Sequence, residues 1–335
     1  MNENDIRPSN LMEEHHKYYL EDMANLQKRS NEFVSVSCPA CDSNEYKKEF
    51  EKYGFNYDRC KKCETIFVNP RATVEILNDH YNTAVYYQYW AKYVFPASEG
   101  ARRKMLFAPR VDRVVELLEK SGKAMDLLVE VGAGFGIFCQ ELKSRNKFKK
   151  IIAIEPIPDL AEKCRSRGLE VIDTGIEEVS LEDECADVVA SFEVIEHLFS
   201  PMDFLIKCSR IIKKGGLLVL SCPNGNGFDL SLLGEKSSSL DGEHINYFNT
   251  SSIGILLTRC GFDVLETITP GKLDAEIARK TILNKEYDIS GQPFLKEVLI
   301  DRWEELGESF QQYLSDNKLS SHMWIVAKKR EVKVL

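Results

Sequence analysis

The stretch that most constrains the fold lies at residues 126–136. An apolar run at residues 127–129 ends in Glu130 and Val131. Three glycines follow, Gly132, Gly134 and Gly136, and a second apolar segment begins at Ile137. A short apolar run that glycine cuts off is typical of a buried parallel strand. Glycines behind such a strand let the backbone adopt positive φ and approach a ligand closely, and the next helix directs free N–H groups to the same point. The pattern predicts a strand, a tight turn and a helix, either with a cofactor or as a turn without a ligand.

The spacing of the glycines separates two classes of cofactor. Dinucleotide-binding turns usually read G-x-G-x-x-G and hold a pyrophosphate at the helix N-terminus. In this chain Ile137 stands where the third glycine of that pattern belongs, and Glu130 precedes the first glycine. A carboxylate at this point would repel a diphosphate but suits the ammonium or sulfonium group of S-adenosylmethionine. The motif therefore favours S-adenosylmethionine over a nicotinamide dinucleotide.

From residue 125 onward, strand and helix patterns alternate, which predicts an α/β fold with a doubly wound, seven-stranded Rossmann-like sheet. The predicted strands cover residues 127–131, 151–155, 169–173, 186–192, 217–222, 262–267 and 323–327. Glu155 lies at the carboxyl end of the second strand, where a carboxylate can accept both hydroxyls of a ribose. About fifty residues of helical pattern separate the last two strands. We expect this insertion to shape either an acceptor pocket or a homodimer surface, with Asp274 on a solvated helix face.

Four cysteines near the N-terminus form two C-x2-C pairs, Cys38 with Cys41 and Cys60 with Cys63, separated by eighteen residues. Four thiolates with this spacing can surround Zn²⁺ tetrahedrally, and a site filled by sulfur has no open position for catalysis. We therefore predict a structural zinc ribbon, with short strands between the two pairs; a redox pair or unliganded thiols are the alternatives.

The remaining segments give the predicted domain organisation. Helices are expected over residues 11–33, 73–81 and 99–121, and the aromatic cluster at residues 86–90 belongs either to the core or to a lid over a ligand. The expected units are an N-terminal helix at 1–35, the zinc ribbon at 36–70, a helical linker or lid at 71–124, a cofactor-binding core at 125–270, and the helical insertion with the final strand at 271–335.

Composition limits the partners and the compartment. The 335 residues carry a net charge of −9, which argues against nucleic acid as the main partner because phosphate binding needs a basic face. The first ten residues are polar, and no stretch is long enough to span a membrane. Ten cysteines without a secretory signal indicate reduced thiols. We expect a cytoplasmic protein that does not bind membranes.

With these motifs in place, the chain resembles the class I S-adenosylmethionine-dependent methyltransferases. The resemblance covers residues 125–268 and the last strand, and it is carried by residues 129–136, 155–156, 186–197 and 215–219. It implies that Gly132, Gly134 and Gly136, with Glu130 and Ala133 in the same motif, line the methionine part of the cofactor. It also implies that Glu155, next to Pro156, binds the ribose, that Ile176 flanks the adenine and that Phe192 lies under the cofactor.

The cysteine ribbon joined to this core narrows the resemblance to zinc-ribbon methyltransferases of nucleotide-sugar and surface-glycan pathways. Those that methylate a sugar carbon have a Glu-His pair followed by Tyr-Phe after the fifth strand, and this chain has Glu243, His244, Tyr247 and Phe248 there. Two features differ: Asp241 replaces a tyrosine of that pattern, and the extra C-terminal domain is missing. Carbon, oxygen and nitrogen acceptors therefore all remain open.

A hydroxyl acceptor must lose its proton, and a positioned histidine typically contributes about 10²–10⁴-fold to such a step. His244 is the first candidate for this base, with Glu243 to orient it, and His197 is the second candidate. Each histidine also has a structural interpretation, such as a helix cap or a hydrogen bond to the backbone. Asp241 either binds the acceptor or starts a turn with Gly242.

The sequence thus predicts a methyltransferase that acts on a small polar acceptor, such as a sugar or a nucleotide-sugar. Three alternatives remain: a binding or scaffold protein that keeps the fold without turnover, a nicotinamide-dependent oxidoreductase, and a nucleic-acid methyltransferase.

Overall fold

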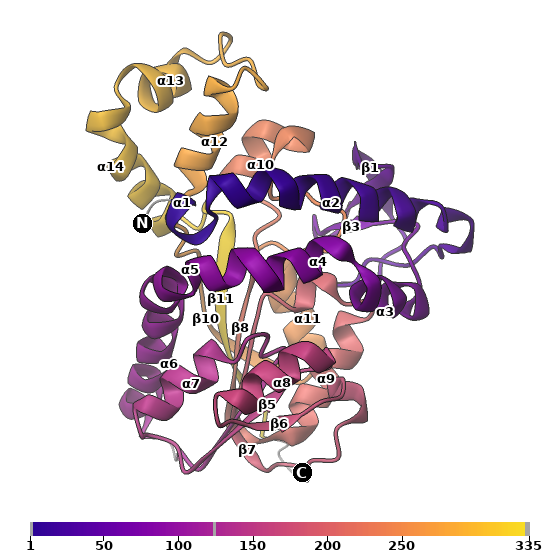
Figure 1. The fold of residues 1–335 in the computed structure, drawn as a ribbon, viewed down its shortest axis with the longest axis vertical. Helices are drawn as coiled ribbons and strands as arrows, with labels where there is room; N and C mark the ends of the chain where they lie inside the picture. Colours follow the sequence, from indigo (N-terminus) through magenta and orange to yellow (C-terminus); the bar gives the residue numbers. More distant parts are fainter. Residues whose placement is uncertain (1–2, 123–124, 332–335) are drawn as a thin grey trace.

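The computed structural model describes residues 3–122 and 125–331, and its centre is a seven-stranded sheet (Figure 1). The strand order is β10-β11-β8-β7-β4-β5-β6, and β11 runs antiparallel to both of its neighbours. The strands are β4 Leu127–Val131, β5 Lys150–Ile154, β6 Glu170–Ile172, β7 Ala186–Phe192, β8 Ile212–Pro223, β10 Phe262–Ile268 and β11 His322–Lys329. The predicted α/β fold with a doubly wound sheet is confirmed.

Helices cover both faces of this sheet, and its central strands β4, β7 and β8 are buried along most of their length. Leu128 packs on the face covered by α6 (Ala108–Ser121) and α7 (Ile137–Ser144). Its neighbour Val129 packs on the opposite face, against α9 (Pro201–Ile211) and α11 (Ser252–Arg259). Successive residues of a strand point to opposite faces, so the continuous apolar run of β4 fills two cores. Helix α8 (Pro158–Ser166) connects β5 to β6.

Strand β8 is longer than predicted. It begins at Ile212 instead of Leu217, because Gly215 and Gly216 lie inside the strand and not in a turn before it. Gly215 has φ +69°, and the pairing register with β7 shifts between Ala186 and Val188. The two glycines therefore accommodate an irregularity of the strand.

A second, antiparallel sheet has the order β1-β2-β3-β9. Strands β1 (Tyr46–Lys52) and β2 (Phe55–Cys60) lead from the first cysteine pair to the second, as predicted, and β3 (Ile66–Val68) follows the second pair. The fourth strand, β9 (Asn246–Tyr247), comes from the loop after β8 of the large sheet. The small sheet therefore joins two segments that are far apart in the sequence.

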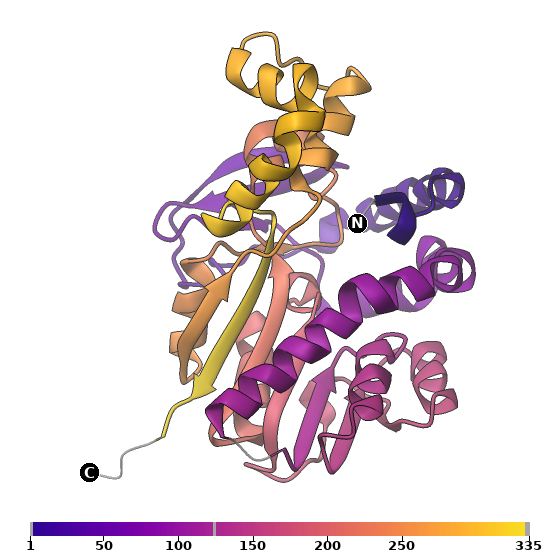
Figure 2. The ribbon, with the colours of Figure 1, turned by 90° about the vertical axis from the view of Figure 1, so that its left-hand side faces the viewer.

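The N-terminal helices lie across the end of the large sheet (Figures 1 and 2). Short helices α1 (Glu3–Ile6) and η1 (Ser30–Glu32) flank α2 (Ser9–Gln27), and α3 (Val74–Thr83) follows the ribbon. Helical structure then continues without a break through α4 (Val85–Tyr89), the π-helical η2 (Trp90–Val94), α5 (Phe95–Arg102), the π-helical η3 (Arg103–Phe107) and α6. This continuous helical segment starts before residue 99, where the sequence predicted the start of a helix. Burial of Tyr86, Val94 and Phe95 outweighs the low helix propensity of Pro96 and Gly100. Gly122 ends α6 with φ +61°, as expected of a C-terminal cap.

The predicted helical insertion is a separate layer beyond the carboxyl edge of the sheet (Figure 2). It contains α12 (Asp274–Leu283), α13 (Pro293–Lys296), the π-helical η7 (Glu297–Asp301) and α14 (Trp303–Asp316), and it packs on α10 (Phe228–Leu233). The solvated position predicted for Asp274 is wrong: its side chain is buried and accepts hydrogen bonds from the Ser321 N–H at 2.7 Å and from Gln311 Nε2 at 2.6 Å. The carboxylate is needed here because it joins the insertion to the start of β11.

Every cysteine lies within the described residues and is a free thiol. Among residues 3–122 and 125–331, no helix has the length and apolar character required to cross a membrane.

Candidate active site

The glycine turn after β4 has one open position and two closed ones. Gly132 and Gly136 have φ of +76° and +71°, and a Cβ at Gly132 would lie 2.3 Å from Val194 Cγ2. At Gly136 a Cβ would lie 2.8 Å from Leu169 Cδ1. At Gly134, with φ +56°, no heavy atom of the described residues would lie within 4 Å of an added Cβ. Packing therefore requires glycine at positions 132 and 136. Gly134 instead faces free space of the kind that a bound ligand would fill.

Glu155, at the carboxyl end of β5, points into this turn. Its Oε2 accepts the Gly134 N–H at 2.7 Å and its Oε1 accepts the Ile157 N–H at 3.0 Å. Burial raises the pKa of the carboxyl to about 7, against the opposing effect of these two donors. Each carboxylate oxygen keeps a lone pair. The residue thus has the acceptors needed for two ribose hydroxyls beside the open position at Gly134.

Glu130 lies behind the turn. Its Oε2 accepts the Cys139 S–H at 2.9 Å, and burial raises its pKa to about 8. A carboxyl that is largely protonated near neutral pH repels a diphosphate only weakly. The spacing of the glycines therefore favours S-adenosylmethionine more strongly than the charge of Glu130 does.

Ile176 lies after β6 and Phe192 is the last residue of β7, and strands β4 and β5 lie between these two strands. Ile176 begins η4 (Ile176–Glu178) after β6 and is buried. Two residues earlier, the buried hydroxyl of Thr174 has no hydrogen-bond partner among the described residues, as expected where a polar ligand supplies one. Phe192 ends β7 and packs between Phe138 and Trp324, with ring centroids 4.8 and 5.5 Å away. The contact of Ile176 with adenine and the position of Phe192 under the cofactor remain predictions.

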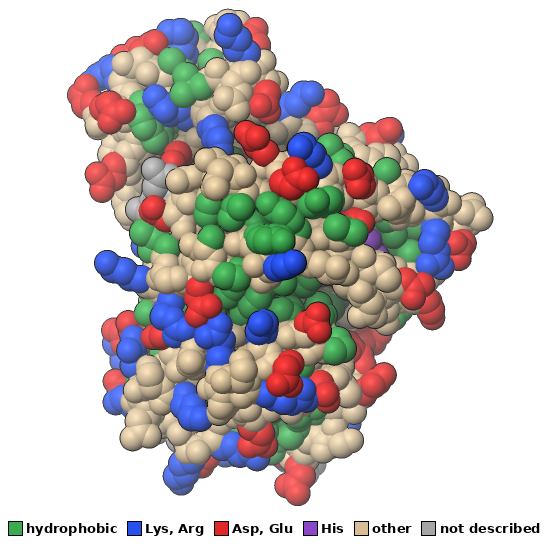
Figure 3. Space-filling model, viewed as in Figure 1, with side chains coloured by type: hydrophobic (Ala, Val, Ile, Leu, Met, Phe, Trp, Pro, Cys, Tyr) green, Lys and Arg blue, Asp and Glu red, His purple; other side chains and the backbone are tan. Residues whose placement is uncertain are grey.

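Helix α5 closes over the glycine turn. The rings of Phe95 and Phe135 stack with centroids 3.4 Å apart. Glu99 pairs with Arg167 at 2.9 Å, and Arg167 Nε donates to the Phe135 carbonyl at 2.7 Å. Figure 3 shows hydrophobic side chains gathered on the outer surface over α2 and the α4–α5 helix. In the segment at residues 86–90, Tyr86 is a buried core residue, as one of the two alternatives predicted. A lid over a ligand stays a prediction.

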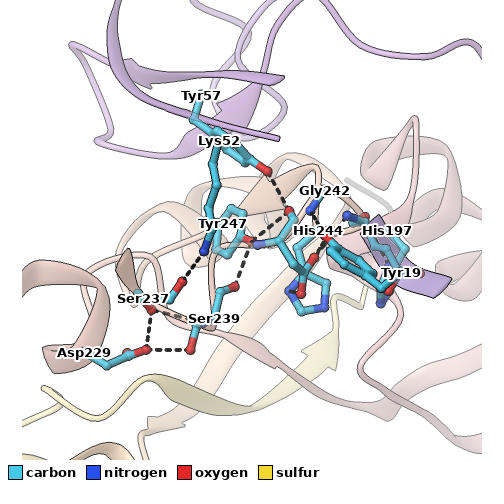
Figure 4. A network of polar contacts seen from close by, with 12 residues as sticks. Tyr19, Lys52, Tyr57, His197, Asp229, Ser237, Ser239, Gly242, His244 and Tyr247 are labelled. Carbon is cyan, nitrogen blue, oxygen red and sulfur yellow. Dashed lines mark hydrogen bonds and ion pairs between the residues drawn. The ribbon is translucent and has the colours of Figure 1, made fainter. Parts of the chain in front are cut away.

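The two predicted catalytic histidines, His197 and His244, lie next to each other (Figure 4). His197 ends η5 (Ile195–His197), which follows β7, and its ring centroid lies 4.7 Å from that of His244. His197 Nδ1 lies 3.2 Å from both the Glu243 carbonyl oxygen and the Tyr81 hydroxyl. The Glu243 carboxyl accepts a hydrogen bond from Tyr86 instead of contacting His244. Glu243 therefore does not orient His244 as predicted. The acidic neighbour of His244 is Asp241, whose Oδ2 lies 3.3 Å from His244 Nδ1.

Asp241 also starts the turn, as one of the two sequence interpretations proposed. Its Oδ1 accepts the N–H groups of Glu243 at 3.0 Å and His244 at 2.8 Å. Burial lowers the pKa of His197 to about 3 and raises that of Glu243 to about 8. An imidazole with so low a pKa is a weak base at neutral pH, so His244 is the better candidate of the two histidines.

Sequence reasoning missed two acidic residues in this region. Glu193 has φ +57°, accepts a hydrogen bond from Ser221 Oγ at 2.5 Å, and has its Oε1 2.8 Å from His322 Nε2. Glu196 is 0% exposed, and both its carboxylate oxygens lack hydrogen-bond partners among the described residues. The sequence does contain a signal that could have identified them, because two carboxylates come directly after a buried strand and before His197.

The small sheet fixes the loop that carries His244. Tyr57 donates to the Asp241 carbonyl at 2.6 Å, and the Gly242 N–H donates to the Tyr19 hydroxyl at 2.7 Å. Figure 4 also shows the preceding stretch, in which Ser237 and Ser239 both donate to Asp229 Oδ2 at 2.6 Å. The loop is thus held by hydrogen bonds from α2, β2 and α10.

The four cysteines of the ribbon meet in one place. Sγ atoms lie 3.4 Å apart for Cys38 and Cys63 and 3.6 Å apart for Cys41 and Cys60, and all four lie within 4.8 Å of one another. Tetrahedral Zn²⁺ with Zn–S bonds of about 2.3 Å separates its sulfurs by about 3.8 Å. The cluster therefore fits a zinc ion. Its two turns are alike, since Asp42 N–H donates to the Cys38 carbonyl and Glu64 N–H to the Cys60 carbonyl.

Comparison with known proteins agrees with this geometry. A family model described as a methyltransferase domain matches residues 100–267, half of the chain, and the chain belongs to this family. The chain is 30% identical over 116 residues to a probable S-adenosylmethionine-dependent methyltransferase of Mycobacterium tuberculosis. The aligned region covers 34% of this chain and 41% of that protein. It is 47% identical over 103 residues to a ubiquinone biosynthesis O-methyltransferase of Roseobacter denitrificans, covering 30% of this chain and 42% of that protein.

The chain thus spans about two fifths of the length of these curated relatives. Among solved structures, a methyltransferase from Archaeoglobus fulgidus is 21% identical, with 71% of this chain and 100% of that chain covered and a TM-score of 0.49.

Proposed function

We propose that this protein transfers a methyl group from S-adenosylmethionine to a small polar acceptor. The observation that carries this proposal is the open space at Gly134 beside the Glu155 carboxylate, at the carboxyl edge of a methyltransferase-type sheet. The cofactor's methionine part would lie along the glycine turn, its ribose on Glu155 and its adenine beside Ile176, with Phe192 under the cofactor.

The chemistry requires donor and acceptor in contact and, for a hydroxyl acceptor, a group that removes the proton. Alignment alone supplies effective molarities of roughly 10⁵ M or more. In this proposal the acceptor enters between the His244 turn and α4, and His244 activates it. The sulfonium donor becomes neutral S-adenosylhomocysteine as the methyl group leaves.

The proposed acceptor class is a sugar or nucleotide-sugar, on the strength of the Glu243-His244 pair and the cysteine ribbon. The ubiquinone O-methyltransferase relative supports a second candidate, a phenolic hydroxyl. We further propose that the four ribbon cysteines bind a structural Zn²⁺. Its binding would contribute on the order of 10 kcal/mol to folding the ribbon.

Transfer of labelled methyl from S-adenosylmethionine to panels of nucleotide-sugars and phenols tests the proposal. The wild-type protein is expected to label at least one panel, and Glu155→Ala and His244→Ala are expected to abolish labelling. If the protein binds S-adenosylhomocysteine but labels no acceptor, the binding or scaffold alternative is favoured instead.

A further inference from the structure

We propose that Glu196, His197 and His244 form a second metal site, which holds a divalent first-row transition ion and through it an acceptor hydroxyl. One ligand atom from each residue lies within 4.8 Å of the other two. The binding of an acceptor hydroxyl to this ion rests on the methyltransferase function proposed above. The metal site itself rests only on the following contacts.

The strongest observation is the Glu196 carboxyl. It is 0% exposed, and neither of its oxygens has a hydrogen-bond partner among the described residues. A buried carboxylate without a partner is costly, and most buried polar groups are satisfied. Protonation does not remove the problem, because the carboxyl O–H would then be a buried donor without an acceptor. A cation bound between this carboxyl and the two imidazoles satisfies it.

The orientation of His197 is the one that metal binding needs. Its Nδ1 lies 3.2 Å from the Glu243 carbonyl oxygen, which can only accept, and 3.2 Å from the Tyr81 hydroxyl, which can also accept, so both neighbours fit a hydrogen on Nδ1. Nε2 then carries the free lone pair. Metal-bound histidines commonly donate their other N–H to a carbonyl or a carboxylate in this way. The Nδ1 of His244 lies 3.3 Å from Asp241 Oδ2 but has no hydrogen-bond partner among the described residues.

The two loops that carry the ligands are fixed to each other. The Ile245 N–H donates to the Glu196 carbonyl at 2.9 Å, and Asn246 Nδ2 lies 3.3 Å from the carbonyl oxygens of Ile195 and Glu196. Asn246 belongs to β9, which pairs with β3 of the ribbon. The three ligands are therefore preorganised by backbone contacts.

The ligand set selects the type of ion. Two imidazoles and one carboxylate suit Mn²⁺, Fe²⁺, Co²⁺, Ni²⁺ or Zn²⁺, whereas Ca²⁺ and Mg²⁺ prefer oxygen ligands. Three protein ligands leave coordination positions open, as in catalytic sites. The open positions would accept the acceptor hydroxyl, and a coordinated O–H loses its proton more readily.

The resulting transfer is balanced without an oxidant. The acceptor O–H releases its proton to solvent, an oxygen lone pair forms the new O–CH₃ bond, and the S–CH₃ bond breaks with its electrons remaining on sulfur. This assignment favours oxygen over carbon as the methylated atom and gives the two histidines the role of ligands.

Mn²⁺ binding tests the site, because Mn²⁺ prefers oxygen and nitrogen ligands and leaves a four-thiolate zinc site in place. The full-length zinc-loaded protein is titrated with Mn²⁺ alone, and free Mn²⁺ is measured by electron paramagnetic resonance. We expect one bound Mn²⁺ per chain, with affinity reduced by about 100-fold or more in Glu196→Gln and His244→Gln. His16→Gln, which removes an imidazole from the N-terminal helix, is the matched control and should bind as the wild type does.

S-adenosylhomocysteine affinity of each variant shows whether it is folded, and it should be unchanged. Equal Mn²⁺ affinity in the wild type and in a folded Glu196→Gln would overturn the inference, as would the absence of Mn²⁺ binding to the wild type at millimolar concentration. Mn²⁺ binding without methyl transfer to any acceptor would support the metal site and count against the proposed function. Methyl transfer that survives both metal removal and Glu196→Gln would support the proposed function and count against the metal site.

Discussion

Ile66 pairs with Tyr247 in the small antiparallel sheet. Ile66 belongs to the cysteine-bearing ribbon, and Tyr247 lies three residues after His244. The same connection is reinforced by Asn249 Nδ2, which donates to the Cys63 carbonyl at 2.9 Å. The ribbon is therefore part of the scaffold that positions the His244 turn, and disturbing it should affect the chemistry of a site in another sheet.

Replacing Asn246 with alanine should separate the two loops. The side chain donates to the Leu198 carbonyl at 2.8 Å and accepts from the buried Arg71 at 3.0 Å. Leaving such buried groups unpaired costs about 1–3 kcal/mol each, so we expect the free energy of unfolding to fall by roughly 2–4 kcal/mol in urea titrations. The turnover rate should fall while the affinity for S-adenosylhomocysteine is retained. Asn284→Ala, on the exposed insertion, is the control and should change stability by less than about 0.5 kcal/mol.

Removing one ribbon thiol should remove the zinc. Cys63→Ser is expected to lower the zinc content from one per chain to near zero in metal analysis and to lower Tm, because a site built from four thiolates needs all four ligands. Methyl transfer should also decrease. Cys185→Ser changes a half-buried cysteine outside the cluster and should leave the zinc content at one. Full zinc retention in Cys63→Ser would contradict the assignment.

Gly134→Ala and Gly122→Ala form a matched pair. Both glycines have left-handed φ, +56° and +61°, and for both no described heavy atom would contact the added Cβ. Each substitution should therefore cost about 1–2 kcal/mol of stability from backbone strain. Only Gly134→Ala places a methyl group in the proposed cofactor crevice, so it alone should weaken S-adenosylhomocysteine binding, by more than tenfold in calorimetry. Equal affinities in the two variants would show that the cofactor lies elsewhere.

Cofactor affinity should depend on pH through Glu155. Burial raises the pKa of this carboxyl to about 7 in the free protein. Ribose hydroxyls donate to the ionised form, so binding lowers the pKa again and the carboxyl releases a proton below pH 7. S-adenosylhomocysteine affinity should therefore decrease as pH falls from 7 to 6. Proton release is measured by calorimetry in two buffers of different ionisation enthalpy. Because the buried Glu130 also titrates nearby, with a pKa of about 8, Glu155→Gln is the control and should remove the pH dependence below 7.

The sequence was sufficient for the large sheet and for the two motifs with fixed spacing. Apolar runs such as residues 186–192 and the glycines at 132, 134 and 136 are local signals, and the structure has them as strand β7 and as a left-handed turn. The C-x2-C pairs were equally informative, because four thiols at such spacings have few other arrangements.

Contacts between distant segments could not be predicted. Strand β9 has two residues, too few to show any periodicity, and it forms only because β3 offers an edge. The partnership of Tyr86 with Glu243 and the lack of partners for Glu196 among the described residues depend on how three loops and α4 pack together. Sequence reasoning therefore found His197 and His244 but paired His244 with Glu243 instead of Asp241.

The most direct test of the account is calorimetric titration of the protein with S-adenosylhomocysteine at pH 7.5. We predict one binding site per chain, with affinity reduced about 10–100-fold in Glu155→Ala, because hydrogen bonds to a charged group are worth about 1.5–3 kcal/mol. The absence of binding heat with the wild type, or an affinity that Glu155→Ala leaves unchanged, would contradict the placement of a methyl donor at this edge of the sheet.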